Sequence, residues 1–160
     1  MVNPPPSDLD NLGVSLDLTL SHRFWRSSLP VHKGVEITID LSDSDPYEYM
    51  ELEEHNEIVL APREFLLGET AEAITLPLDV CAWIEGKSGR ARQGLVVHLT
   101  APKIDPGWGI QRAKPITLEI VNHFDQKVKL RAGVPIAQLV FHRLGGPTTP
   151  YGGVHQDRGS

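Results

Sequence analysis

Short runs of alternating or clustered apolar residues make up most of the chain, and prolines and glycines separate these runs. Such runs are typical of β-strands, because strand side chains alternate between two faces of a sheet. Thirteen prolines and fourteen glycines among 160 residues supply the turn positions. The pattern predicts an all-β domain with strands at residues 13–20, 35–41, 57–60, 65–69, 73–77, 80–85, 95–100, 116–122, 126–131 and 135–144.

The close spacing of these runs suits a jelly-roll or a similar closed sandwich. One segment, 87–93, is expected to form a short helical turn between Gly86 and Gly94, because glycine accepts backbone angles that other residues resist. The first turn of such a helix offers unpaired N–H groups to an anion. The turn therefore becomes a candidate ligand contact.

The length of 160 residues suits a single domain. We expect it to span residues 12–144, after a loosely structured opening segment at residues 1–11. The acidic stretch 40–54 is interpreted as a solvated loop. The tail 145–160 is rich in Gly, Pro and Thr and has one aromatic residue, Tyr151, so it cannot pack a core of its own. It is either a frayed end or a flap that orders over a ligand.

The overall charge argues against a nucleic-acid-binding protein. Fifteen Lys and Arg residues stand against 21 Asp and Glu residues, and the net charge is -6. A small anionic ligand needs only a local cluster of donors and stays compatible with this charge. No run approaches the roughly 18 apolar residues that span a membrane, and the first residues lack the layout of a signal peptide, so we expect a cytoplasmic protein.

A basic turn at residues 85–94 holds the densest polar cluster of the chain. Lys87, Ser88, Arg90, Arg92 and three glycines fall within these ten residues. Glycine lets a backbone approach a ligand closely, and cations neutralise phosphate, so the segment could cradle a triphosphate. A basic surface turn between two strands would have the same composition, and both interpretations stay open.

Two further positions are ambiguous in the same way. Asp105 precedes Pro106-Gly107, which is ordinary turn chemistry, and Trp108 beyond it suits either a core or a site. Glu119 alternates with Leu118 and Ile120, so its side chain points to the opposite face of its strand. That face is either simply exposed to solvent or part of a site.

Several catalytic classes find no support. Zinc-dependent deaminases need a Pro-Cys-x-x-Cys pair, and the chain has one cysteine, Cys81, within an apolar run. The phosphate-binding loop of P-loop enzymes and the nucleophile elbow of serine hydrolases are both missing. Because the seven histidines lack metal-ligand spacing, we expect no zinc and no other metal held by protein side chains.

Read in order, several segments resemble the deoxycytidine triphosphate (dCTP) deaminase branch of the trimeric dUTPase-like superfamily. The resemblance covers nearly the whole chain from about residue 12, and it implies a distorted jelly-roll or dUTPase-like β-barrel. It also implies a homotrimer with active sites between subunits, and hydrolysis of dCTP to dUTP and ammonia without zinc, with Mg²⁺ bound through the triphosphate. The matching segments are residues 12–18, 62–70, 84–94, 94–108, 116–122 and 131–139.

The resemblance assigns catalytic roles to three of these residues. Glu119 matches the glutamate that deprotonates the attacking water, Ser88 matches the serine that holds this water, and Arg92 matches the arginine that orders the site. Lys87 falls where the family has a basic phosphate contact. Gly89 stands where a second serine is usual, so a hydroxyl contact is lost while the backbone amide remains.

The hairpin residues receive substrate-binding roles on the same basis. The backbone around Thr100 and Ala101 would read the cytosine edge, Asp105 would approach the deoxyribose, and Trp108 would pack on the sugar and disfavour a 2′-hydroxyl. Gln138 matches a motif glutamine that also occurs in the uridine branch.

The chain also departs from the family pattern. The link 109–115 is a few residues longer than usual, an N-terminal helical segment is missing, and Val154 and His155 replace a common Lys-Tyr pair. Tyr151 and Gln156 remain as expected phosphate contacts. Three alternatives therefore stay open: a dUTP diphosphatase, a bifunctional deaminase that forms dUMP, and a catalytically silent nucleotide-binding regulator.

Overall fold

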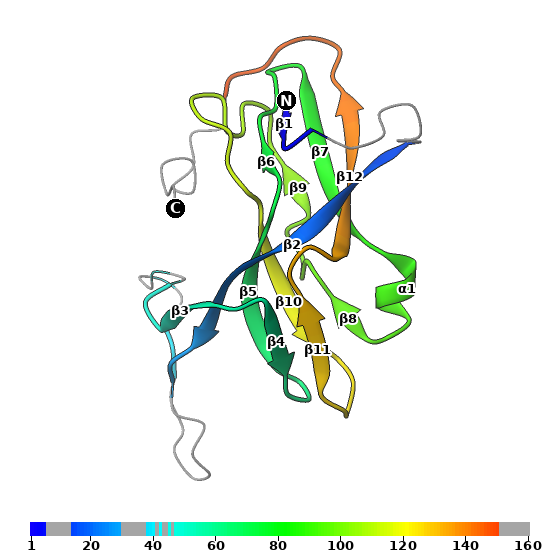
Figure 1. Cartoon of the computed structure of the whole chain (residues 1–160). Helices are drawn as coiled ribbons and strands as arrows, with labels where there is room; N and C mark the ends of the chain where they lie inside the picture. Colours follow the sequence, from blue (N-terminus) through cyan, green and yellow to red (C-terminus); the bar gives the residue numbers. More distant parts are fainter. Residues whose placement is uncertain (6–13, 30–37, 41, 43–44, 46, 151–160) are drawn as a thin grey trace.

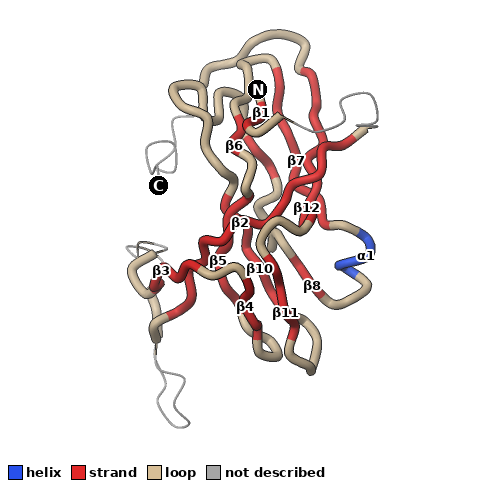
Figure 2. Tube along the Cα trace, viewed as in Figure 1, coloured by secondary structure: helices blue, strands red, loops and turns tan. Residues whose placement is uncertain are grey.

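The chain folds almost entirely into strands and loops, with one short helix (Figures 1 and 2). The structure is a computed structural model that describes residues 1–5, 14–29, 38–40, 42, 45 and 47–150. The all-β prediction with one short helix is confirmed. The elements are β1 (Val2–Asn3), β2 (Ser15–Ser27), β3 (Met50–Glu54), β4 (Glu57–Leu60), β5 (Phe65–Thr70), β6 (Ala73–Ile74), β7 (Val80–Gly86), α1 (Ser88–Ala91), β8 (Leu95–Val96), β9 (Lys103–Ile104), β10 (Thr117–Asn122), β11 (Val128–Arg131) and β12 (Pro135–Arg143).

The main sheet runs in the order β8-β10-β5-β2-β12-β7-β9, with β3 added to β2. Two small sheets, β1-β6 and β11-β4, complete the described part of the chain. β2 crosses the molecule diagonally (Figure 1). Its first half pairs with β12 and its second half with β5, and the register shifts between Leu20 and Phe24. One long strand thus joins the two halves of the main sheet.

The hydrophobic core follows the alternation in the sequence. Leu16, Leu18 and Leu20 of β2 are buried, while Asp17 between them is exposed. On β10, Leu118 and Ile120 are fully buried. Further core residues come from most of the other strands or from positions just beyond a strand end: Ile58, Leu60, Leu66, Ile74, Leu76, Ala82, Ile84, Leu95, Val97, Ile104, Ile116, Leu130, Ile136, Ala137 and Leu139.

The acidic stretch is more ordered than predicted. Its last five residues form β3, which pairs with β2, so the prediction of a loop over 40–54 is wrong there. Two ion pairs explain how an acidic strand is accommodated: Glu54 lies 3.8 Å from the Arg23 side chain and Glu53 lies 3.4 Å from Arg26. The prediction used the acidic residues alone and did not anticipate arginines on the neighbouring strand.

Other strand predictions differ in extent. β2 continues seven residues beyond the predicted end at Leu20, because its second half pairs with a different strand. The strand predicted at 95–100 ends at Val96, since the Leu99 N–H donates to a side chain rather than to the ladder. Of the strand predicted at 35–41, only residues 38–40 are described, and they are not in a strand.

The two ends of the described chain lie against the same part of the fold. Val2–Asn3, within the segment expected to be loose, pairs with Ala73–Ile74. In the tail, the Thr148 N–H donates to the Leu78 carbonyl at 2.9 Å. Pro150 packs against Gly107, where an added Cβ would lie 2.9 Å from the Pro150 Cβ. Residues 145–150 therefore pass beside the turn that precedes Trp108. No helix in the described residues is long and apolar enough to cross a membrane.

Candidate active site

The basic turn forms the short helix α1 and is held by its neighbours. The Lys87 carbonyl accepts the N–H groups of residues 90 and 91, and the Arg92 N–H donates to the Ser88 carbonyl. Gly94 ends the turn with a φ of 69°, and a Cβ there would lie 2.6 Å from the Phe124 ring. The His123 N–H donates to the Gly94 carbonyl at 2.8 Å. Only glycine fits this junction, which fixes α1 to the loop after β10.

Lys87 is joined to Gln138 through neighbouring strands. The Lys87 ammonium lies 2.5 Å from a carboxylate oxygen of Asp17 on β2, and Asp17 lies opposite Gln138 of β12 in the ladder. The Gln138 amide donates to the Gly86 carbonyl at 3.4 Å and its oxygen accepts from the Ser15 hydroxyl at 3.2 Å. Lys87, a predicted phosphate contact, and the motif glutamine Gln138 are thus brought together by β2, β7 and β12.

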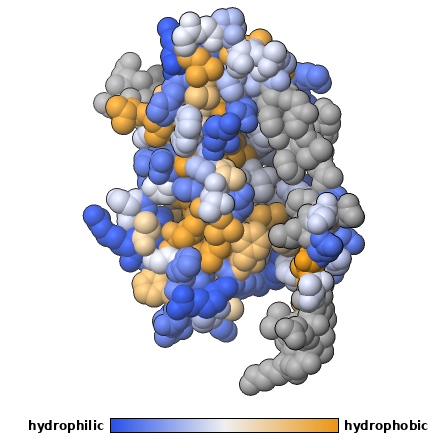
Figure 3. Space-filling view, turned by 180° about the vertical axis from the view of Figure 1, so that it is seen from behind, coloured by the Kyte–Doolittle hydropathy of each residue, from blue (hydrophilic) through white to orange (hydrophobic). Residues whose placement is uncertain are grey.

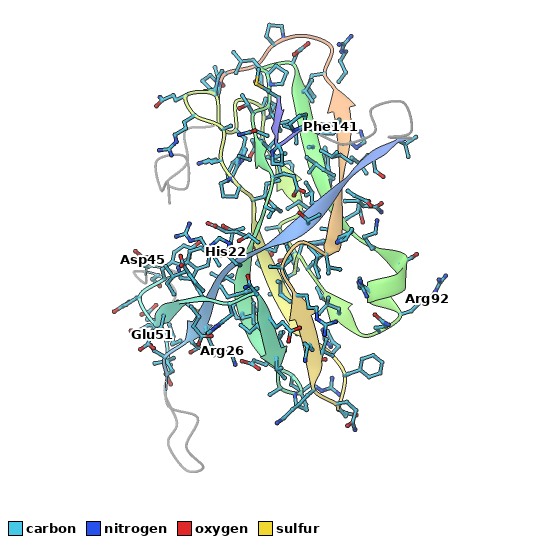
Figure 4. The ribbon with its side chains drawn as sticks, viewed as in Figure 1. His22, Arg26, Asp45, Glu51, Arg92 and Phe141 are labelled. Carbon is cyan, nitrogen blue, oxygen red and sulfur yellow. The ribbon has the colours of Figure 1, made fainter. Side chains whose placement is uncertain are left out.

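Three residues in α1 and directly after it face solvent. Ser88, Gly89 and Arg92 are exposed, and no atom lies within 4 Å of a Cβ built on Gly89. The Arg92 side chain points away from the body of the molecule (Figure 4). The first turn of a helix leaves N–H groups without intrahelical partners, so this surface presents donors outward. It can accept an anion from outside the chain.

Glu119 is not simply on an exposed strand face. It lies on β10 opposite Leu67 of β5, and one of its carboxylate oxygens, Oε2, accepts the Leu99 N–H at 2.9 Å. The side chain is half-buried, and its hydrogen bond with the Leu99 N–H fixes the position of the loop that follows β8. Thr100 and Ala101 come directly after Leu99, so the predicted base and the predicted cytosine-reading backbone belong to one local arrangement.

The turn at residues 105–108 is tied to its own strand and to the core. The Lys103 ammonium lies 2.9 Å from Asp105, which raises the pKa of Lys103 by hydrogen bonding and charge attraction. The Trp108 N–H donates to the Asp105 carbonyl at 3.2 Å, and the half-buried Trp108 ring packs against the core. Both interpretations of Trp108 therefore have a basis: part of the ring packs and part remains exposed.

The predicted site residues fall into two groups within the described chain. No hydrogen bond or ion pair among the described residues joins Glu119 to Ser88 or Arg92. Tyr151 and Gln156 lie outside the described residues. We name the two groups the basic turn group (Lys87, Ser88, Gly89, Arg92 and Gln138) and the hairpin group (Thr100, Ala101, Asp105, Trp108 and Glu119).

Several residues that contact the predicted site residues were not singled out from the sequence. Asp17 and Ser15 hold Lys87 and Gln138, Lys103 holds Asp105, and Lys114 lies over the Trp108 ring. The pair of Lys103 and Asp105, two positions apart, could have been found from spacing. The others depend on strand register or on the path of a loop and leave no local signal.

An apolar area lies on the sheet face that carries Glu119 (Figure 3). Leu67, Glu119 and Val121 share this outer face of β5 and β10, because paired and alternate residues point the same way. Leu99 beside them is 48% exposed and Leu52 on β3 is 47% exposed. Exposed apolar side chains on the face that carries Glu119 favour an additional surface covering this face.

Comparison with known proteins shows which protein family the sequence matches. A protein-family model described as dCTP deaminase-like matches residues 3–144. The chain is 35% identical to a dCTP deaminase of Shewanella amazonensis, with 94% of this chain and 79% of that protein covered. It is 44% identical to a dUMP-forming dCTP deaminase of Methanoculleus marisnigri, with 86% of this chain and 69% of that protein covered.

A solved structure shows the same fold. The crystal structure of the 2′-deoxycytidine 5′-triphosphate deaminase from Agrobacterium tumefaciens superposes with a TM-score of 0.65 at 22% sequence identity. The match covers 90% of this chain and 43% of that longer chain. The expected fold is confirmed by this likeness. The sequence matches to the two dCTP deaminases cover 94% and 86% of this chain.

Proposed function

The chain belongs to the dCTP deaminase-like family, and on that premise we propose that it hydrolyses dCTP to dUTP and ammonia. The observation that supports this most is the Glu119 carboxylate, which is oriented by the Leu99 N–H beside Thr100 and Ala101. Its second oxygen, Oε1, accepts no hydrogen bond from the residues that the structure describes. That oxygen is available to a water molecule.

In the proposed reaction, water attacks C4 of cytosine and Glu119 takes the proton of this water. The carboxylic acid gives this proton to ring atom N3. Glu119 then takes the second proton from the new C4 hydroxyl and gives it to the amino group, so that the C4–N bond breaks, ammonia leaves and a carbonyl forms at C4. General acid-base action of this kind contributes about 10²- to 10⁴-fold to a rate. The remaining acceleration would come from positioning of the water and the ring, for which we propose Ser88 and Arg92.

The triphosphate would be held by the basic turn group. Lys87 supplies a cation, the exposed first turn of α1 supplies N–H donors at Ser88 and Gly89, and Gln138 supplies an amide next to Lys87. Among the described residues, no group of three or more His, Cys, Asp or Glu side chains could hold a metal. We propose that Mg²⁺ arrives with the triphosphate, whose oxygens are its preferred ligands.

We further propose that the active enzyme is a homotrimer whose sites combine the basic turn group of one subunit with the hairpin group of another. Among the described residues no hydrogen bond or ion pair joins Glu119 to Ser88 or Arg92, which supports this arrangement. So does the exposed apolar area around Glu119, which a second subunit would cover. The expected cytoplasmic location stays a prediction.

The proposal predicts that the purified protein releases ammonia from dCTP with Mg²⁺ and without added zinc. Glu119→Gln keeps the shape and the Leu99 contact but cannot accept a proton. We expect kcat to fall about 10²-fold or more, with dCTP binding retained. Ammonia release and calorimetric titration with dCTP measure the two quantities. A Glu119→Gln protein that turns over dCTP like the wild type would contradict the role of Glu119.

A dUMP-forming deaminase is the second candidate, and the 44% identity to a protein of that name favours it. Asp105 resembles the catalytic aspartate of the uridine branch, and Lys103 orients its carboxylate. Chromatography of the nucleotide product separates dUTP from dUMP. Conversion of dUTP but not dCTP would indicate a dUTP diphosphatase, and binding without any turnover would indicate a regulatory protein.

A further inference from the structure

The link 109–115 is attached at both ends to the same short segment. Before the link, the Trp108 carbonyl accepts the Leu76 N–H at 2.9 Å. At its far end, Lys114 and Ile74 exchange two backbone hydrogen bonds of 2.8 and 3.2 Å. The link therefore leaves and returns beside residues 74–76.

Gly109 is required for this attachment. Its φ is 64°, a left-handed conformation that side chains rarely adopt, and a Cβ there would lie 2.3 Å from the Ile74 carbonyl oxygen. The Thr75 hydroxyl also donates to the Gly109 carbonyl at 3.2 Å. The backbone on either side of Trp108 is consequently fixed.

The Trp108 ring is held in a different way from its backbone. Its indole nitrogen Nε1 is buried and has no hydrogen-bond acceptor among the described residues. The Lys114 ammonium lies over the ring, 4.2 Å from the ring centroid. Because no indole hydrogen bond fixes the ring among these residues, its orientation depends on packing and on the cation–π contact with Lys114.

We propose that Lys114 is a positioning residue that sets the orientation of the Trp108 ring and, through it, the selection of deoxyribose over ribose. The inference rests on the proposed function, in which Trp108 packs on the sugar. A ring held in one orientation excludes a 2′-hydroxyl, whereas a ring free to tilt leaves room for it. The link that carries Lys114 thus contributes to substrate selection from beside the site.

The test replaces Lys114 and follows both nucleotides. Lys114→Met keeps the side-chain length and removes the charge. We expect the KM for dCTP to rise about two- to five-fold with kcat nearly unchanged, and the preference for dCTP over CTP to fall by a similar factor, because a cation–π contact near the surface has about that strength. Lys114→Arg should restore the wild-type values, since Arg also stacks on aromatic rings.

Two controls separate positioning from a general effect of charge or stability. Arg112→Met removes a cation from an exposed position of the same link and should change neither KM nor preference. In a Trp108→Leu background, Lys114→Met should have no further effect on KM, preference or the unfolding midpoint, because the two residues act as one unit.

The proposal is overturned if Lys114→Met behaves like the wild type, if Arg112→Met has the same effect, or if the effect persists in the Trp108→Leu background. A wild-type protein that releases no ammonia from dCTP would contradict the proposed function instead. Calorimetric affinities for dCTP and CTP, together with the unfolding midpoints of the four proteins in the cycle, would then report on Lys114 separately.

Discussion

Glu69 carries a carboxyl group that is nearly buried on the outer face of β5. The residue is 9% exposed and lines an open pocket of about 350 Å³ at the register shift of β2. Burial raises the pKa of Glu69 above its ordinary value of 4.5, although Arg23 at 3.2 Å and His22 act in the opposite direction. The folded protein therefore holds this proton more tightly than the unfolded chain does.

The raised pKa predicts how stability changes with pH. The contribution of Glu69 is complete below pH 4.5, its ordinary value, and is lost as the pH rises through the folded-state pKa, because the ionised carboxylate is poorly solvated. Compared with Glu69→Gln, the wild type should lose unfolding free energy as the pH rises from 4.5 towards neutrality. Urea unfolding of both proteins across this range measures the difference. A constant difference would show that Glu69 does not titrate as described.

The link 109–115 and the turn after β11 illustrate how elements are fixed by backbone conformation. Gly109 and Gly133 both have a positive φ, of 64° and 78°. They differ in surroundings, because a Cβ on Gly109 would meet the Ile74 carbonyl at 2.3 Å, whereas a Cβ on Gly133 would meet no atom within 4 Å. A comparison of the two positions therefore separates two losses of unfolding free energy: the loss from a left-handed backbone conformation and the loss from a close atomic contact.

Replacing each glycine by alanine should therefore have unequal effects. Gly133→Ala should lower the free energy of unfolding by about 1–2 kcal/mol, which is the strain of a left-handed residue that has a side chain. Gly109→Ala should cost more than that, because the backbone of residues 74 or 109 must also move. It should also raise the KM for dCTP by displacing Trp108. Denaturant unfolding and steady-state kinetics give the two quantities, and equal unfolding costs would argue against the close contact at Ile74.

At the scale of the whole molecule, the arrangement of the two site groups predicts a shared active site. Ser88→Ala and Glu119→Gln should each be inactive, because each removes one group from every site. When the two proteins exchange subunits, about a quarter of the sites in a random mixture would combine two intact groups. Ammonia release should then reappear in the mixture, and light scattering should give three times the chain mass. A mixture that stays inactive after proven subunit exchange would place both groups in one subunit.

The sequence by itself determined the all-β class, most strand positions, the helical turn at α1 and, through its ordered motifs, the family. Alternation and turn residues are local signals, so they are readable without knowing where a strand pairs. Motif order placed Glu119, Ser88 and Trp108 as candidates, but their surroundings could not be read in this way.

Only the tertiary structure decided what those residues contact. Glu119 meets the Leu99 N–H, Asp17 meets Lys87 across 70 positions of sequence, and Lys114 lies over Trp108 through the path of the link. The strand β3 in an acidic stretch likewise depends on Arg23 and Arg26 of β2. Each of these contacts depends on register and packing between distant segments, and these follow from the burial of the whole core rather than from neighbouring residues.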